Sequence, residues 1–195
     1  MPSRDSYHHG DLRRALTDAA LVLVRERGPK GFSLTEVARR AGVSAAAPYR
    51  HFADKADLLA TVATLGFRQL TAALNAVPAG GDGRQRLVEM GRQYVRWALD
   101  HADFYLVMFG ADTKQSDRTE VVRAAEDAFR ALLDAISVAV SSGVLKVDDQ
   151  HELAGSLWSV VHGTATLAIG RDLRHAGITT PAEDLAALTI AAVLR

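Results

Sequence analysis

The chain has 195 residues, of which 48% are hydrophobic, with 23 basic and 23 acidic side chains and no cysteine. This composition is typical of a folded globular protein, and it excludes disulfide bonds and thiolate catalysis. The first residues lack the pattern of a signal peptide, and no stretch resembles a membrane span, so we expect a cytoplasmic protein without a membrane partner.

The basic side chains are unevenly distributed along the chain. Up to residue 55 there are ten Lys and Arg against six Asp and Glu, and after it there are thirteen against seventeen. A basic N-terminal part beside an acidic remainder is expected of a phosphate-binding head on a body that does not bind nucleic acid. Random scatter is the alternative, because the excess of charge is small.

The first predicted helix covers residues 11–28, where apolar residues recur at helical spacing until a glycine-proline pair ends the helix. We interpret residues 4–10 as a frayed terminus, with an arm that lies along DNA as the alternative. His8 and His9 are adjacent and lack the spacing that puts two ligands on one helical face, so we expect no metal site there.

The stretch that follows has the order of two short helices joined by a tight turn. Ser33 and Glu36 match a capping box, and Gly42 is placed to end the first helix with a positive φ. Ser44 is placed to cap the second helix, which we expect to be short and irregular because Pro48 removes a backbone donor. Three small residues give this helix a thin face that can enter the DNA major groove: Ala45, Ala46 and Ala47.

A recognisable pattern runs through this stretch and into the next helix: Thr35, Ala38, Ala41-Gly42-Val43-Ser44, Tyr49-Arg50-His51-Phe52, Lys55 and Leu58-Leu59. In this pattern the sequence resembles the TetR family of bacterial transcriptional regulators, which implies a DNA-binding N-terminal domain. We expect the DNA-binding residues to be Ser33, Thr35, Arg40, Ser44, Ala45, Ala46, Ala47, Tyr49, Arg50, His51 and Lys55. An ammonium is unfavourable at a helix start unless an anion such as phosphate lies beside it, and the resemblance favours a phosphate contact for Lys55 over a solvated side chain.

The remainder of the chain predicts helices only. Asp54 is expected to cap a helix that runs from Lys55 to about Ala76, and a glycine-rich linker follows it. Further helices are predicted at residues 84–101, 102–109, 117–141, 150–172 and 182–194. Capping boxes support two of these starts, Asp117 with Glu120 and Thr180 with Glu183. The predicted fold is all-α with about nine helices: a three-helix helix-turn-helix domain at residues 1–55 and a larger helical domain, for ligand binding and dimerisation, at residues 56–195.

Aromatic residues concentrate in this second domain, where they can line a cavity for an apolar or aromatic ligand or simply fill a helical core. The predicted ligand-binding residues are Tyr94, Trp97, Phe104, Tyr105, Met108, Phe129, Trp158, His162 and Thr166. The segment from Trp158 through Gly163 also resembles the Trp-His-Gly signature of one TetR subgroup's C-terminal domain.

Small residues form a stripe along the penultimate helix, and apolar residues form a surface on the last one. Such stripes let helices approach closely, which suits a symmetric dimer seam. The predicted dimer interface comprises Gly155, Ser159, Gly163, Gly170, Leu185, Leu188 and Ala192.

These features together predict a homodimeric repressor that a small apolar or aromatic ligand releases from a palindromic operator. The alternative is a constitutive DNA-binding protein without a small-molecule effector. The usual sequence motifs of hydrolases, nucleotide-binding proteins and dinucleotide-binding proteins are absent from the chain, so we expect neither an enzyme nor a cofactor. The expected partners are double-stranded DNA, a small-molecule effector and a second copy of the chain.

Overall fold

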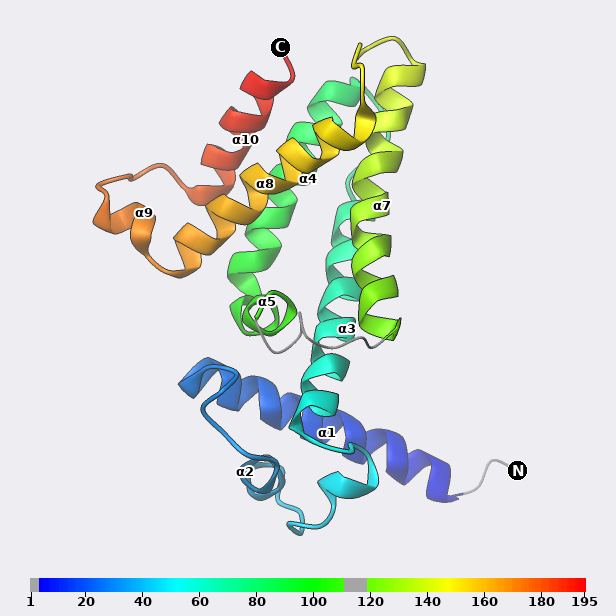
Figure 1. The fold of residues 1–195 in the computed structure, drawn as a ribbon, viewed down its shortest axis with the longest axis vertical. Coiled ribbons are helices and arrows are strands. Elements are labelled where there is room, and N and C mark those ends of the chain that lie inside the picture. The colour runs from blue at the N-terminus through cyan, green and yellow to red at the C-terminus, as the bar shows by residue number, and fades with distance from the viewer. Residues whose placement is uncertain (1–3, 111–118) are drawn as a thin grey trace. The chain divides into compact units, whose positions relative to one another are not determined.

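The computed structural model describes residues 4–110 and 119–195, and every regular element in these ranges is helical (Figure 1). Nine α-helices and one short 3-10 helix lie in the described ranges, which contain no strand. The prediction of an all-α chain is therefore confirmed. Within the same ranges, no helix combines the length and the apolar character that crossing a membrane requires.

The chain divides into two compact units. The first comprises Met1–Gly66 and Ala102–Val122, and the second comprises Phe67–His101 and Arg123–Arg195. Helix α3 (Lys55–Asn75) contributes residues to both units. The domain boundary predicted at residue 55 stays a prediction.

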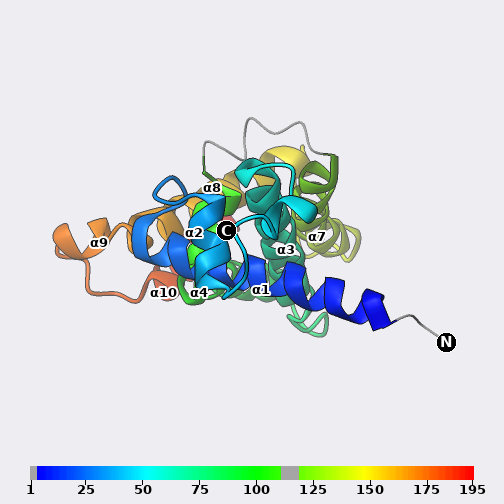
Figure 2. The same cartoon turned by 90° about the horizontal axis from the view of Figure 1, so that it is seen from below.

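Four elements and the start of α3 build the first unit. Helix α2 (Leu34–Arg40) packs against α1 (Arg4–Arg27), as Figure 2 shows, and α5 (Ala102–Met108) also lies against α1. A 3-10 helix, η1 (Pro48–Arg50), precedes α3. The largest fully buried side chains of this unit are apolar and come from several of these elements: Leu16, Leu23, Val37, Phe52 and Leu58.

Helix α1 is longer than the sequence predicted. It begins at Arg4, so the interpretation of residues 4–10 as a frayed segment before the helix is wrong. The backbone of His8 and His9 lies in the first turns of α1, and their side chains are outside the described part of the structure.

The second unit contains the rest of α3 and five further helices: α4 (Gly83–Asp100), α7 (Thr119–Ser141, from Arg123), α8 (Gln150–Ile169), α9 (Asp172–His175) and α10 (Ala182–Val193). Helix α4 packs against both α8 and α10. Gly91 makes this packing possible, because a Cβ at that position would collide with the Ile190 side chain of α10 and meet Val161 of α8 at 3.4 Å.

Two predicted features near the C-terminus are wrong. The helix predicted at residues 150–172 ends at Ile169, because Arg171 takes a left-handed φ of 66°, and a separate short helix, α9, follows. The capping box of Thr180 with Glu183 does not form. Pro181 occupies the N-cap of α10 with an extended ψ of 137°, and no side chain in this described segment caps the helix. The capping box predicted at Asp117 lies outside the described residues.

Candidate functional sites

The capping box at the start of α2 forms as predicted. The Glu36 amide donates to the Ser33 hydroxyl at 3.3 Å, and the Ser33 amide donates to the Glu36 carboxylate at 2.9 Å. The Arg27 guanidinium also lies 2.7 Å from this carboxylate. The hydrogen bond from the Ser33 backbone, and then the one from Arg27, hold the pKa of Glu36 below its ordinary value. The carboxylate therefore fixes where α2 starts.

The end of α2 also follows the prediction. Gly42 has a φ of +73° and donates its amide to the Arg39 carbonyl at 3.2 Å. The Val43 amide donates to the Ala38 carbonyl at 3.0 Å. These two bonds define a Schellman motif, which satisfies the last carbonyls of the helix and turns the chain sharply. The direction of the following segment is thus set by local hydrogen bonds.

The second predicted helix of this motif is not an α-helix. The Ala47 amide donates to the Ser44 carbonyl at 2.9 Å and closes a turn, after which only the 3-10 helix η1 forms. Pro48 has no amide, so an α-helix starting at Ser44 would lack its next hydrogen bond, whereas proline is well suited to the first position of a new helical turn. Ala47 is the N-cap of η1, and the predicted role of Ser44 as a helix cap is wrong.

The side chains of this turn divide sharply between solvent and core. Ser44, Ala45, Ala46, Tyr49 and Arg50 are exposed, with Tyr49 at 58%. Ala47 and Pro48 are buried, so Ala47 does not offer its methyl group to DNA as the sequence predicted. Among the other predicted DNA-binding residues, Ser33 and Thr35 are exposed and His51 is half-buried.

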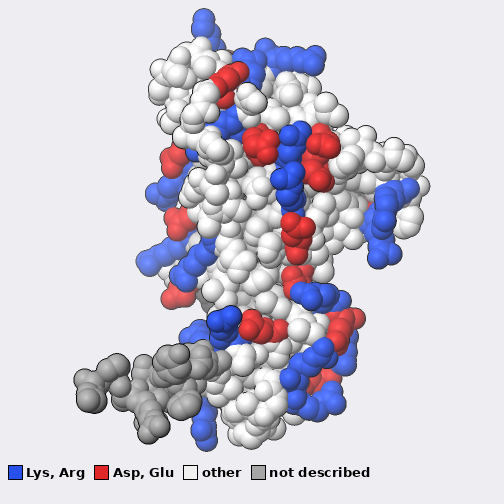
Figure 3. Space-filling model, turned by 180° about the vertical axis from the view of Figure 1, so that it is seen from behind, with Lys and Arg blue, Asp and Glu red and all other residues white. Residues whose placement is uncertain are grey.

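Arginines near the turn differ in their partners. Arg40, a predicted DNA-binding residue, makes a bidentate ion pair with Glu26 of α1 at 2.6 and 3.2 Å. Exposed Arg39 and Arg50 have no acidic partner among the described residues. Arg39 was not predicted from the sequence, since nothing local distinguishes it from Arg40. Figure 3 shows basic side chains interspersed with acidic ones over one face of the molecule.

Lys55 has an environment that neither sequence interpretation anticipated. Its ammonium donates to the backbone carbonyls of Phe32 at 2.7 Å and Lys30 at 3.2 Å, and it lies 4.3 Å from the centre of the Phe32 ring. These contacts tie the start of α3 to the loop before α2. They also explain how an ammonium is tolerated at a helix N-terminus. The phosphate contact of Lys55 stays a prediction.

Four predicted ligand-binding residues come together in the second unit and form an aromatic cluster: Tyr94, Phe129, Trp158 and His162. The Tyr94 hydroxyl and the His162 Nδ1 lie 3.5 Å apart, within hydrogen-bonding distance. The Trp158 ring lies 5.8 Å from Phe129 and 5.9 Å from His162, measured between ring centres. Trp158 is 42% exposed, so one side of the cluster faces solvent.

The other predicted ligand-binding residues have separate environments. Trp97 is buried and stacks on His101 with 5.0 Å between ring centres. Exposed Thr166 donates its hydroxyl to the His162 carbonyl at 2.8 Å. The remaining three belong to α5 in the first unit: Phe104, Tyr105 and Met108.

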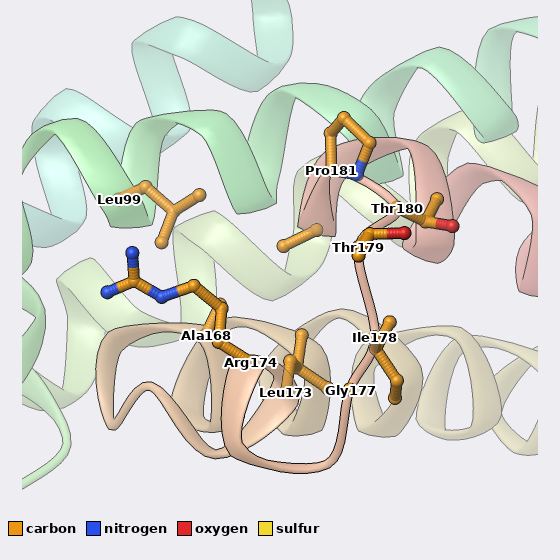
Figure 4. Close-up of a pocket in the computed structure, with 10 residues that line it drawn as sticks. Leu99, Ala168, Leu173, Arg174, Gly177, Ile178, Thr179, Thr180 and Pro181 are labelled. Atoms are coloured by element: carbon orange, nitrogen blue, oxygen red, sulfur yellow. The ribbon is translucent and has the colours of Figure 1, made fainter.

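A hollow of about 530 Å³ lies beside the start of α10, in the second unit (Figure 4). Its lining is mainly apolar and comes from the ends of α4 and α8, from α9, from the segment before α10 and from the first residue of α10: Leu99, Ala168, Leu173, Arg174, Gly177, Ile178, Thr179, Thr180, Pro181 and Ala182. None of the predicted ligand-binding residues, all of which are described, belongs to this lining.

The predicted dimer residues lie on surfaces of α8 and α10. A Cβ added at Gly155 or Gly163 would meet no described atom within 4 Å, and Ser159 is exposed. Exposed apolar side chains accompany them: Trp158 at 42%, Leu167 at 44%, Leu188 at 65% and Val193 at 45%. Gly170 and Ala192 are exposed, and Leu185 is half-buried.

Comparisons with known proteins agree on both parts of the chain. The family described as bacterial regulatory proteins, tetR family, matches residues 16–62, and the tetracyclin repressor-like C-terminal domain matches residues 87–193. The HTH-type transcriptional regulator BetI of Rhizobium meliloti is 28% identical over 171 residues, which are 87% of this chain and 82% of the relative. These relatives are transcriptional regulators rather than enzymes.

Two solved structures extend the comparison to the fold. A protein of unknown function from Rhodococcus sp. RHA1 has a TM-score of 0.80 and 32% identity, with 96% of this chain and 97% of that chain covered. The TetR family transcriptional regulator PfmR from Thermus thermophilus has a TM-score of 0.75 and 22% identity, with 92% and 97% covered. The subgroup suggested by Trp158, His162 and Gly163 stays a prediction.

Proposed function

Because the chain belongs to the TetR family of DNA-binding transcriptional regulators, we propose that it is a homodimeric repressor that a small apolar or aromatic ligand releases from a palindromic operator. The observation that carries the proposal is the exposed turn at residues 44–50, which follows α2 and is fixed to it by the Schellman motif. This is the order of elements that places a recognition segment in the major groove.

In this proposal the DNA-binding head contacts both the base edges and the sugar-phosphate backbone. Ser44, Ala45 and Ala46 face the base edges, while exposed Tyr49 and Arg50 contact the sugar-phosphate backbone beside them. Arg39, Ser33 and Thr35 at α2 add phosphate contacts.

Two basic side chains orient the head through contacts within the protein. Arg40 orients α2 through Glu26, and Lys55 orients the loop before α2 through its two carbonyl contacts. His51 is half-buried next to Phe52 and contributes at the edge of this surface.

Dimerisation through α8 and α10 would bury apolar side chains that these helices expose, among them Leu167, Leu188 and Val193. Open space at Gly155 and Gly163 lets a second helix approach the backbone of α8 closely. Leu188, at 65% exposure, would gain the most from burial. A two-fold dimer presents its two heads to half-sites about 34–36 Å apart, or a multiple of this spacing, which requires an inverted repeat in the operator.

The aromatic cluster is the proposed ligand site. A ligand that inserts beside Trp158 can contact two aromatic faces and exchange hydrogen bonds with Tyr94 or His162. It shifts the protein away from the operator-binding state only by as much as it prefers the other state.

A constitutive DNA-binding protein is the second candidate, and one observation favours it. Tyr94 and His162 already lie within hydrogen-bonding distance of each other, and Trp158 already packs on Phe129. A cluster whose polar groups are satisfied in this way is also a sound packing arrangement without a ligand.

Selection of bound sequences from random duplexes at fixed salt tests the proposal. The expected result is an inverted repeat bound by a dimer, with the stoichiometry measured by light scattering on the complex. Arg50→Ala is the variant expected to weaken binding, and Lys146→Ala, an exposed lysine of the second unit, is its control. Equal affinity for all duplexes, or a monomer bound to a single unrepeated site, would contradict the proposal.

A further inference from the structure

The tip of the exposed turn presents two methyl groups to solvent. Ala45 and Ala46 are exposed at the point where the chain leaves α2, whereas Ala47 and Pro48 point into the core of the first unit. The sequence has no long side chain between Ser44 and Tyr49. Between Ser44 and Tyr49, the exposed side chains of the turn therefore offer aliphatic carbon only.

Local hydrogen bonds hold these two methyl groups in place. The Val43 amide is bonded to Ala38 and the Ala47 amide to Ser44, so both ends of the tip are closed. Buried Pro48 accepts the Phe52 amide at 2.9 Å, and Phe52 is itself among the largest fully buried side chains. A tip anchored on both sides can place a methyl group against a fixed position of the groove.

Base-pair chemistry limits what such a methyl group can recognise. In the major groove, guanine, adenine and cytosine present hydrogen-bond donors or acceptors, and thymine alone adds an apolar group, its C5 methyl. An alanine pressed against a polar base edge removes water from it and returns no hydrogen bond, which is unfavourable. An alanine pressed against the thymine methyl buries apolar surface on both sides.

From this geometry we infer that Ala45 and Ala46 determine sequence specificity by reading thymine C5-methyl groups in each half-site. The inference rests on the proposed function, because it takes the turn at residues 44–50 as the major-groove element. Tyr49 and Arg50 hold the turn in the groove, and the two alanines reject base pairs that lack a methyl group at the positions they face. The ligand chemistry is the 5-methylpyrimidine edge, which thymine and 5-methylcytosine share.

Uracil substitution tests this inference on the full-length protein. In an operator recovered by selection, each thymine of one half-site is replaced in turn by deoxyuridine, which keeps the base pair and removes only the methyl group. Loss of one buried methyl is expected to weaken binding about fourfold, at one or two positions per half-site, as measured by fluorescence anisotropy at fixed salt. At those positions, a 5-methylcytosine–guanine pair should bind more tightly than a cytosine–guanine pair.

Alanine variants identify the side chains that read the methyl group. Ala45→Gly and Ala46→Gly should each abolish the uracil effect at one position, and the coupling is measured as a double-mutant cycle. This comparison is independent of any general weakening that glycine causes in the turn. Ala53→Gly is the matched control, because Ala53 is exposed, lies outside the turn and keeps its amide bonded to Asp57 at 2.9 Å. It should leave the uracil effect unchanged.

The possible results separate this inference from the proposed function. Selective binding to an inverted repeat with no uracil effect at any position would overturn the inference and leave the proposed function intact. A uracil effect that persists undiminished in both glycine variants would also overturn it, because another side chain would then read the methyl group. Equal affinity for every duplex would overturn both.

Discussion

Lys55→Met tests whether the ammonium at the start of α3 positions the DNA-binding head or contacts DNA. Methionine keeps an unbranched apolar stem and removes the charge and its three donors. The substitution therefore breaks the hydrogen bonds to the carbonyls of Phe32 and Lys30 and the cation–π interaction with the Phe32 ring. All of these interactions lie inside the first unit, so the primary effect is expected on the stability of that unit.

The magnitude follows from these interactions. The part-buried bond to the Phe32 carbonyl is charge-assisted and contributes ~1.5–3 kcal/mol, whereas water can replace the exposed bond to Lys30. The cation–π contact adds ~0.5–1 kcal/mol. Removing a positive charge from the first turn of a helix recovers ~0.3–1 kcal/mol. We therefore expect the free energy of unfolding of the first unit to fall by about 2 kcal/mol.

Two measurements are needed, because the two roles predict different results. The stability of the first unit is measured by urea denaturation, monitored by circular dichroism, and by hydrogen exchange at α2. Tryptophan fluorescence would not report on this unit, because both tryptophans lie in the second unit. The dependence of DNA affinity on salt reports phosphate contacts, and its slope should be unchanged in Lys55→Met but smaller by about one in Arg50→Met. Lys30→Met is the control, because Lys30 is exposed in the same loop. A Lys55→Met protein of unchanged stability, with a slope smaller by about one, would refute the positioning role.

Three further predictions concern single contacts. Asp103→Ala should lower the free energy of unfolding of the first unit by about 1–2 kcal/mol in urea, because buried Asp103 pairs at 2.6 Å with the largely exposed Arg25. Gly91→Ala should cost ~1–3 kcal/mol in the second unit by overpacking against Ile190, and adding Ile190→Val should restore part of the loss. The lowered pKa of Glu36 means that its ionised form adds stability above its ordinary pKa of 4.5, and that this stability is lost as pH falls through the folded-state value. Glu36→Gln should therefore have a lower free energy of unfolding than the wild type at neutral pH. This difference should disappear when urea denaturation is repeated at decreasing pH.

The features that the sequence predicted correctly depend on neighbouring residues. Ser33 and Glu36 are three positions apart, and Gly42 follows directly on the last turn of α2, so their hydrogen bonds are nearly independent of the rest of the chain. Asp54 likewise caps α3 by accepting the Asp57 amide at 2.7 Å. The helical periodicity of the long helices is equally local, and the predicted bounds of α3, α4 and α10 lie within about one residue of the observed ones.

The features that the sequence missed depend on contacts between distant residues or on competing local rules. Arg40 and Glu26 are fourteen positions apart, and Lys55 is more than twenty from the carbonyls that it binds. Nothing in a residue's own neighbourhood encodes such partners. At Pro48 and Pro181 a capping pattern competed with the missing amide and fixed φ of proline, and proline determined the backbone in both places.

Helix α4 connects the proposed ligand site to the part of the proposed dimer face that lies on α10. Tyr94 of α4 lies 3.5 Å from His162 of α8, and one turn earlier Gly91 lets α4 close on Ile190 of α10. A ligand inserted between Tyr94 and His162 would separate α4 from α8 at this point, because the two side chains already lie within hydrogen-bonding distance. Helix α4 also packs against α10, which packs against α8, so a displacement of α4 would be transmitted to α10. Since the proposed dimer face is made of α8 and α10, binding of the proposed ligand would change the geometry of the dimer. The equilibrium between the operator-binding and the released state shifts only by as much as the ligand prefers the released state.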